Sequence, residues 1–137
     1  MLLRGPLIAL CSCTAALALS ACGTATSTSN FKGVQHEVAQ RVSDLQSDVA
    51  ASDNSKICTA DLAGPIVTRL GGRKTCEEAV KKQLNQIDNP EVTINKVTLA
   101  PDGKSATASV KSIRDGKSVA STVTLVKEGG TWKVSAP

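Results

Sequence analysis

Residues 91–135, EVTINKVTLAPDGKSATASVKSIRDGKSVASTVTLVKEGGTWKVS, alternate apolar and polar side chains between short clusters of turn-forming residues. A period of two residues is typical of strands with one buried face. Turns are expected at residues 101–103, 114–117 and 128–130. Asp115-Gly116 is a strong hairpin signal, because both residue types tolerate the positive φ angles of a type I′ turn. The stretch therefore predicts a meander of four antiparallel strands.

The alternation also predicts which side chains are buried. In the first strand it changes parity across Asn95-Lys96, which indicates a β-bulge. In the second strand one face is lined by small and β-branched residues. The expected buried residues of these two strands are Val92, Ile94, Val97, Leu99, Ala106, Ala108 and Val110.

Before residue 91 the apolar period changes to that of a helix. A first helix of about 20 residues is predicted by the spacing of apolar residues at intervals of three and four. These residues are Val34, Val38, Val42, Leu45 and Val49. A second helix is expected over residues 59–70, where Pro65 removes a backbone donor and can divide the segment into two short turns.

A third helix is expected after Gly71-Gly72, which ends the second. Thr75 and Glu78 have the spacing of a capping box. The apolar stripe that follows consists of Ala79, Val80, Leu84 and Ile87. Helices first and strands afterwards predict an α+β domain, with the helices on one face of a four-stranded antiparallel sheet.

The chain opens with one cation, Arg4, and an uncharged apolar run over residues 7–19. This run is shorter than the roughly 20 residues of a membrane-spanning helix, and it ends on small residues. Residues 1–21 are therefore predicted to be a secretory signal peptide.

The end of that run, Leu19-Ser20-Ala21-Cys22, resembles the lipobox of bacterial lipoproteins. The resemblance implies that Cys22 becomes a diacylglyceryl cysteine, acylated with chains such as palmitate, and the first residue of the mature protein. Two acyl chains suffice for a stable anchor at the cell membrane. The alternative is an ordinary signal-peptidase site with an incidental cysteine beside it.

Residues 23–30 contain only Gly, Ala, Thr, Ser and Asn. Such a composition has nothing to bury, so residues 22–30 are predicted to be a lipidated cysteine followed by a flexible tether. Residues 31–137 then form a single small domain.

The composition argues against nucleic acid as a partner. The formal net charge is +4, or +3 without Arg4, and the charges are interspersed. Nucleic-acid surfaces combine a basic stripe with aromatic side chains. The sequence has no tyrosine, and its aromatic residues are Phe31 and Trp132.

The five cysteines divide by position. Cys11 and Cys13 leave with the signal peptide, and Cys58 and Cys76 remain in an oxidising compartment as a predicted disulfide. This bond would close a loop of about 18 residues and stabilise the fold by roughly 3 kcal/mol. Two free thiols or a metal site are the alternatives. Structural zinc needs four ligands, and His36 is the only histidine.

The order of helix, cysteine pair, and strands ending in Gly-Gly-Thr-Trp-Lys-Val resembles small exported lipoproteins of actinobacteria with a nuclear-transport-factor-two-like domain. The resemblance covers about residues 31–134. It implies a cystatin-like cone, which often encloses a pocket and pairs through its open sheet face. Relatives with this fold include isomerases and cyclases.

The side chains that such catalysis needs are hard to assign. Isomerases of this kind need a carboxylate base beside an oxyanion donor. The carboxylates Asp44, Asp48, Asp53 and Asp61 are expected on solvated helix faces and helix ends. His36 is expected on the surface, and residues 71–75 lack the glycine spacing of a phosphate loop. No catalytic residue, metal or cofactor is predicted.

Trp132 is expected to cover the open end of the core, with a partner anchor as the alternative. The sequence thus predicts a non-catalytic, membrane-anchored lipoprotein that faces outside the cytoplasm. It would bind a protein partner or an apolar ligand, as a monomer or a dimer. An isomerase-like enzyme and a structural or regulatory accessory of an envelope complex are the alternatives.

Overall fold

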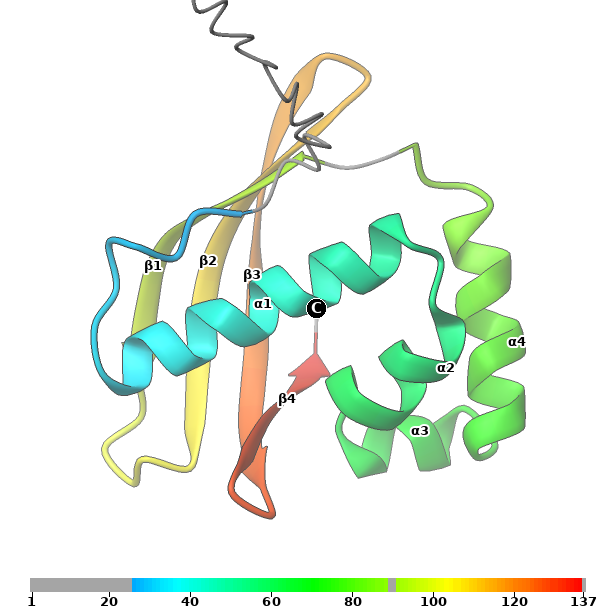
Figure 1. Ribbon diagram of the computed structural model, residues 1–137, viewed down its shortest axis with the longest axis horizontal. Helices are drawn as coiled ribbons and strands as arrows, with labels where there is room; N and C mark the ends of the chain where they lie inside the picture. The colour runs from blue at the N-terminus through cyan, green and yellow to red at the C-terminus, as the bar shows by residue number, and fades with distance from the viewer. Residues whose placement is uncertain (1–25, 89–90, 137) are drawn as a thin grey trace, which may run out of the picture.

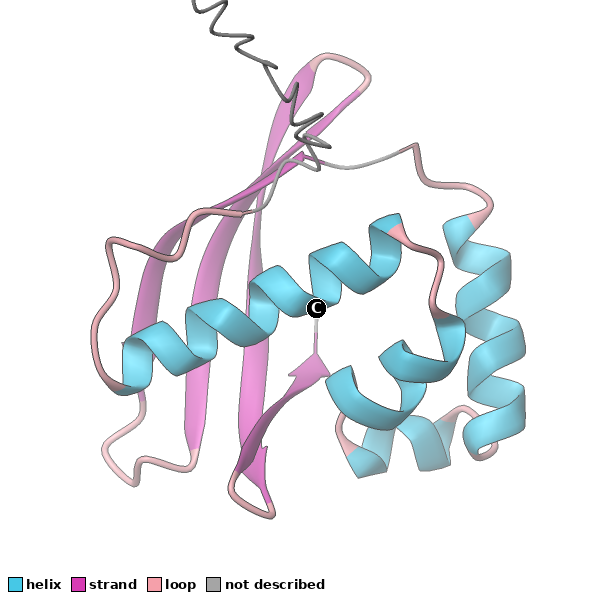
Figure 2. Ribbon diagram, viewed as in Figure 1, coloured by secondary structure: helices cyan, strands magenta, loops and turns pink. Residues whose placement is uncertain are grey.

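The computed structural model describes residues 26–88 and 91–136. Its sheet has four antiparallel strands in the order β1-β2-β3-β4. Helix α1, Val34–Ala50, crosses one face of this sheet, and the shorter helices lie beside β4 (Figure 1). Helix α1 is therefore the element that forms a second layer over the sheet, while the shorter helices extend the domain to one side (Figure 2). The predicted α+β arrangement is confirmed. The strands are Glu91–Leu99 (β1), Ser105–Arg114 (β2), Lys117–Glu128 (β3) and Thr131–Ala136 (β4).

The strand register agrees with the predicted bulge and turns. Ile94 pairs with Val110 and Lys96 with Ser109, so Asn95 is the additional residue of β1. At the β2–β3 turn, Asp115 and Gly116 have φ angles of 50° and 72°. Both values lie in the left-handed region that a type I′ turn requires.

The core lies between α1 and the sheet. It is built from alternate residues of the strands and from one face of the helix, as their periods predict. Its buried members are Val38, Ala39, Val42, Ile94, Val97, Ala106, Ala108, Val110, Leu125, Trp132 and Val134.

The segment expected as one helix over residues 59–70 is broken. A short helix α2, Asn54–Lys56, continues into a π-helical turn η1, Ile57–Asp61, and α3 begins only at Gly64 and ends at Arg69. Between them, the backbone N–H of Ala63 donates to the carbonyl of Val134 at 2.8 Å. Pro65 stands at the start of α3, where its missing N–H costs nothing. The predicted division of this segment is thus observed. At the break, the backbone N–H of Ala63 makes its hydrogen bond to β4 and not within a helix.

The predicted start of the third helix is wrong. Helix α4 spans Arg73–Leu84, with Gly72 as its N-cap and no side-chain cap. The N–H of Cys76 donates to the carbonyl of Gly72 at 2.9 Å, so the first turn is complete before Thr75 could act as a cap. Cys76 is the buried residue of α4. The predicted stripe of Ala79, Val80, Leu84 and Ile87 is only half-buried.

The domain begins earlier than residue 31. Thr26 is buried, and its Oγ1 donates to the carbonyl of Val92 at 3.1 Å. The Ser43 hydroxyl donates to the carbonyl of Thr26 at 3.4 Å. The described part of the expected tether, residues 26–30, is therefore docked against α1 and β1. The hydroxyl groups of Thr26 and Ser43 hold this segment by donating to backbone carbonyls, whereas a prediction from composition considers only apolar side chains.

Candidate functional site

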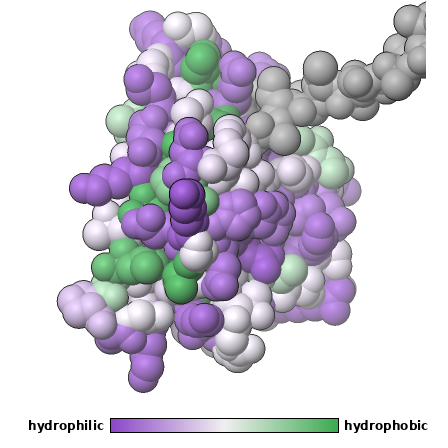
Figure 3. Space-filling view, turned by 60° about the vertical axis from the view of Figure 1, so that its left-hand side comes forward, coloured by the Kyte–Doolittle hydropathy of each residue, from purple (hydrophilic) through white to green (hydrophobic). Residues whose placement is uncertain are grey.

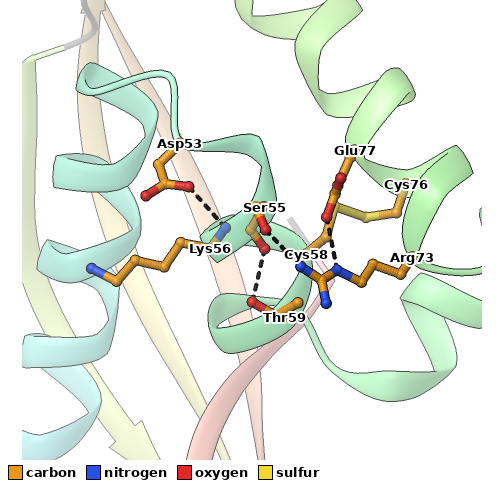
Figure 4. Close-up of a disulfide and its surroundings, with 8 residues drawn as sticks. All are labelled: Asp53, Ser55, Lys56, Cys58, Thr59, Arg73, Cys76 and Glu77. Carbon is orange, nitrogen blue, oxygen red and sulfur yellow. Dashed lines mark hydrogen bonds and ion pairs between the residues drawn. A yellow bond between two sulfur atoms is a disulfide. The ribbon is translucent and has the colours of Figure 1, made fainter.

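The disulfide between Cys58 and Cys76 is present, as predicted, and its Cα atoms are 6.1 Å apart. It joins η1 to the first turn of α4 (Figure 4). Both cysteines are buried. Cys76 is the one residue of α4 that is fully buried, so this bond joins the helix covalently to the domain beside its half-buried apolar stripe.

Around the disulfide, an exposed set of polar side chains links the same elements. Arg73 contacts Glu77 at 2.8 Å and also donates to the Ser55 hydroxyl at 2.9 Å. The hydrogen bond from Arg73 lowers the pKa of Glu77. In Figure 4, Lys56 extends the opposite way, toward α1. Exposed pairs of this kind contribute little to stability, so the covalent bond dominates this contact.

A second cluster was not expected from the sequence. Asp48 and Asp61 are both buried, with relative exposures of 5% and 0%. Arg41 donates to Asp61 Oδ1 at 3.1 Å, and Lys56 donates to Asp48 Oδ1 at 2.9 Å. The two Oδ2 atoms have no donor among the described residues. A proton shared between the two carboxyl groups satisfies both oxygens.

Burial raises the pKa of Asp61 to about 6, and the hydrogen bond with Asp48 adds to the effect while Arg41 opposes it. The hydrogen bond to Asp48 in turn raises the pKa of Lys56. The cluster therefore places two cations beside two buried carboxyl groups, and Asp61 takes up a proton on mild acidification.

The prediction that these aspartates lie on solvated surfaces is wrong. Asp48 is on the polar side of α1, but α2 and η1 fold back over the end of that helix and bury it. A signal was present in the sequence. Arg41, Asp44 and Asp48 recur at intervals of three and four, so they form a charged stripe that a second charged segment, Lys56 to Asp61, could cover.

Arg41 connects this cluster to the surface. Its side chain is partly exposed and contributes to an open depression of about 280 Å³. Two acidic side chains, Glu37 and Asp44, share the depression with it. Asp61 itself is fully buried, so in this packing no substrate can contact its carboxyl group.

Trp132 lies in the core and is 3% exposed. The ammonium group of Lys127 is 5.6 Å from the centre of its ring. The indole Nε1 is buried and has no hydrogen-bond partner among the described residues. Trp132 therefore lies in the core, as expected, and its buried ring is not available as a surface anchor.

The remaining candidates lie apart from one another. His36 is exposed, with Nδ1 at 3.1 Å from the carbonyl oxygen of Thr28. Asp44 accepts a hydrogen bond from Gln40, and Asp53 caps α2 by accepting from the N–H of Lys56. None of these is brought to the buried pair. Cys22 lies outside the described residues.

The described residues contain no group of three His, Cys, Asp or Glu side chains placed to hold a metal ion. Residues 26–88 and 91–136 also include no helix long and apolar enough to cross a membrane.

Comparison with protein-family models, with curated proteins and with solved structures found no match.

Proposed function

We propose that the protein is a lipoprotein anchored through Cys22 to the outer face of the cell membrane, and that its domain acts by binding. The disulfide is the observation that carries the proposal. Because Cys58 and Cys76 bond to each other, Cys22 is the only cysteine after residue 21 that remains for another chemistry. It follows directly on an uncharged apolar run, where a lipid-modified cysteine is expected.

The disulfide also supports the location. Stable disulfides form mainly in exported proteins, because cytosolic reductants keep thiols reduced. A signal peptide over residues 1–21 supplies the route of export.

The docked N-terminal segment supports a close approach to the membrane. Thr26 is buried against β1, only four residues after Cys22. Four extended residues span at most about 14 Å. A lipid on Cys22 would thus hold the domain directly above the headgroups.

A binding role is favoured over catalysis by the burial of the paired carboxyl groups. An acid or base must come within hydrogen-bond distance of its substrate, and Asp61 is enclosed. The ligand in this proposal is a protein partner or an apolar molecule.

The anchor is tested by growing the host with a labelled palmitate analogue and isolating the full chain. We expect label on the wild type and none on Cys22→Ala, with the variant lost from the membrane fraction. Ser20→Ala is the matched control and should keep the label. Label that persists in Cys22→Ala would contradict the anchor.

The binding role is tested by native mass spectrometry of the protein released from its host. A discrete apolar adduct would identify a carrier, and its absence together with a reproducible cross-linked partner would identify a protein-binding module. Turnover of any substrate by the purified chain would overturn the non-catalytic proposal.

A further inference from the structure

One edge of the sheet is left open. Strand β4 pairs only with Thr124–Glu128 of β3. Residues 117–123 of β3 pair with β2 on one side and with no described strand on the other. Residues 117–122 are also exposed without interruption.

The register identifies the free backbone groups. Arg114 and Lys117 pair directly across the two-residue turn, which makes them a hydrogen-bonded pair. Hydrogen-bonded and non-hydrogen-bonded pairs alternate along antiparallel strands. The N–H and C=O groups of Ser118, Ala120 and Thr122 therefore point away from β2 into the unoccupied side.

The opposite edge of the sheet is protected. Strand β1 is bulged at Asn95, and two of its carbonyl groups are occupied by side chains. Thr26 donates to the carbonyl of Val92, and Gln35 donates to that of Val97, both at 3.1 Å. Figure 3 turns this side of the molecule forward and shows a mainly hydrophilic surface with several small apolar areas among the polar side chains. Proteins protect edges in such ways against unwanted strand pairing. Among the described residues, residues 117–123 have no bulge, and no side chain is seen to occupy their outward backbone groups.

The composition of the open edge suits another strand. Residues 118–123, Ser-Val-Ala-Ser-Thr-Val, contain no proline, glycine or charge. Val119 is 44% exposed and is one of the few large apolar side chains on the surface. Lys117 is the single charged residue, and it stands at one end of the segment.

We propose that this edge pairs with the same edge of a second copy of the chain, antiparallel and with Val119 opposite Val119. In this register Ser118 of one copy and Ala120 of the other exchange hydrogen bonds, and Gly116 lies opposite Thr122. The two exposed valines cover each other, while each Lys117 faces Ser121 of the other copy. The two lysines therefore lie at opposite ends of the junction.

The neighbouring register is blocked by β4. Centring the pair on Ala120 would place Gly116 of one copy opposite Thr124 of the other. That position is occupied, because Thr124 already pairs with Ala136. The result is one continuous sheet through two protomers, formed by the addition of strand to strand.

The junction is small. A standard stable interface buries about 800 Å² on each partner, more than a short strand pair supplies. The dimer is therefore weak in dilute solution and depends on local concentration. Pairing through β3 does not require lipid on Cys22. A membrane anchor would raise the fraction of dimer, because it raises the local concentration of the chain.

A cysteine at position 119 tests the register. The full chain carrying Val119→Cys is produced in its host, and linked peptides are identified by mass spectrometry after non-reducing electrophoresis. Facing residues of a non-hydrogen-bonded pair have Cα atoms about 4.5 Å apart, within the range of a disulfide. We expect a 119–119 linked dimer.

Ile113→Cys is the matched control, since Ile113 is 47% exposed but lies on β2. We expect at least ten-fold less dimer from it. A monomer from Val119→Cys, equal dimer from both variants, or a link from residue 119 to a different protein would each overturn the proposal.

A second variant tests whether backbone hydrogen bonds join the two copies. Ala120→Pro in the Val119→Cys chain removes an outward N–H that makes no bond to β2. We expect the 119–119 dimer to fall about ten-fold while the Cys58–Cys76 bond stays intact, and an unchanged yield would contradict strand pairing. The lipid anchor is tested separately, by whether the chain stays in the membrane fraction. If the anchor proposal fails, concentrated protein in solution should still form the 119–119 disulfide.

Discussion

The sheet with α1 and the segment from α2 to α4 are held together by different means. The first has a continuous apolar core that draws residues from α1 and all four strands. The second buries little beyond Ile57, Ala63 and the two cysteines, together with Asp61. It depends on a covalent bond and on a cluster of charges. One short chain thus combines a region stabilised by packing with a region stabilised by a cross-link.

The largest expected effect is in the packed region. Leu125 is fully buried in the part of β3 that pairs with both β2 and β4. Leu125→Ala removes apolar contacts and leaves a cavity, so we expect the free energy of unfolding to fall by about 3–5 kcal/mol. Chemical denaturation measures this, with the exposed Val119→Ala as a control that should change it by less than about 0.5 kcal/mol. Equal losses from both variants would contradict the assigned core.

The next largest effect is in the cross-linked region. Replacing Cys58 and Cys76 together by serine releases a loop of 18 residues. We expect a loss of about 3 kcal/mol, chiefly because the unfolded chain gains freedom. Denaturation of the double variant measures the loss. An unchanged midpoint would mean that α4 is held by packing after all.

The buried carboxyl pair should make stability depend on pH. The pKa of Asp61 is raised to about 6 in the folded protein from 3.8. A raised pKa means that the folded state binds the proton more tightly than the unfolded state. The stabilisation is therefore complete below about pH 4 and is lost as the pH rises through 6, by on the order of 3 kcal/mol.

Asp61→Asn should flatten this dependence, because the amide does not titrate. Unfolding at pH 4.5 and pH 7 compares the two chains, with Asp44→Asn as the control on the same charged stripe of α1. If Asp61→Asn keeps the slope of the wild type, the pair does not share a proton.

The smallest effect is expected at the surface beside the disulfide. Arg73 is largely exposed and pairs with Glu77 within one helix. We expect Arg73→Gln to change the free energy of unfolding by no more than about 0.5 kcal/mol. A loss comparable to that of the cysteine variant would show that polar contacts and not the cross-link hold α4.

Features that depend on local sequence could be predicted, and features that depend on contacts between distant segments could not. The strands, the bulge at Asn95 and the Asp115-Gly116 turn are local patterns, and each follows from period and backbone preference. The disulfide follows from cysteine positions. The burial of Asp48 does not, because it depends on η1 returning over α1. The helix start at Gly72 is decided by a backbone hydrogen bond, and the docking of Thr26 by hydroxyl groups that donate to carbonyls of residues distant in sequence. Neither partner can be identified from residue types alone.

Hydrogen exchange of the chain with both Cys58 and Cys76 replaced by serine tests most directly whether the two regions are held by different means. We expect amides of α3 and α4 to lose protection at least ten-fold relative to the wild type, while amides of α1 and β1–β3 keep their ranking as the slowest to exchange. A uniform loss over all elements, or no loss in α4, would contradict the division into a packed region and a cross-linked one.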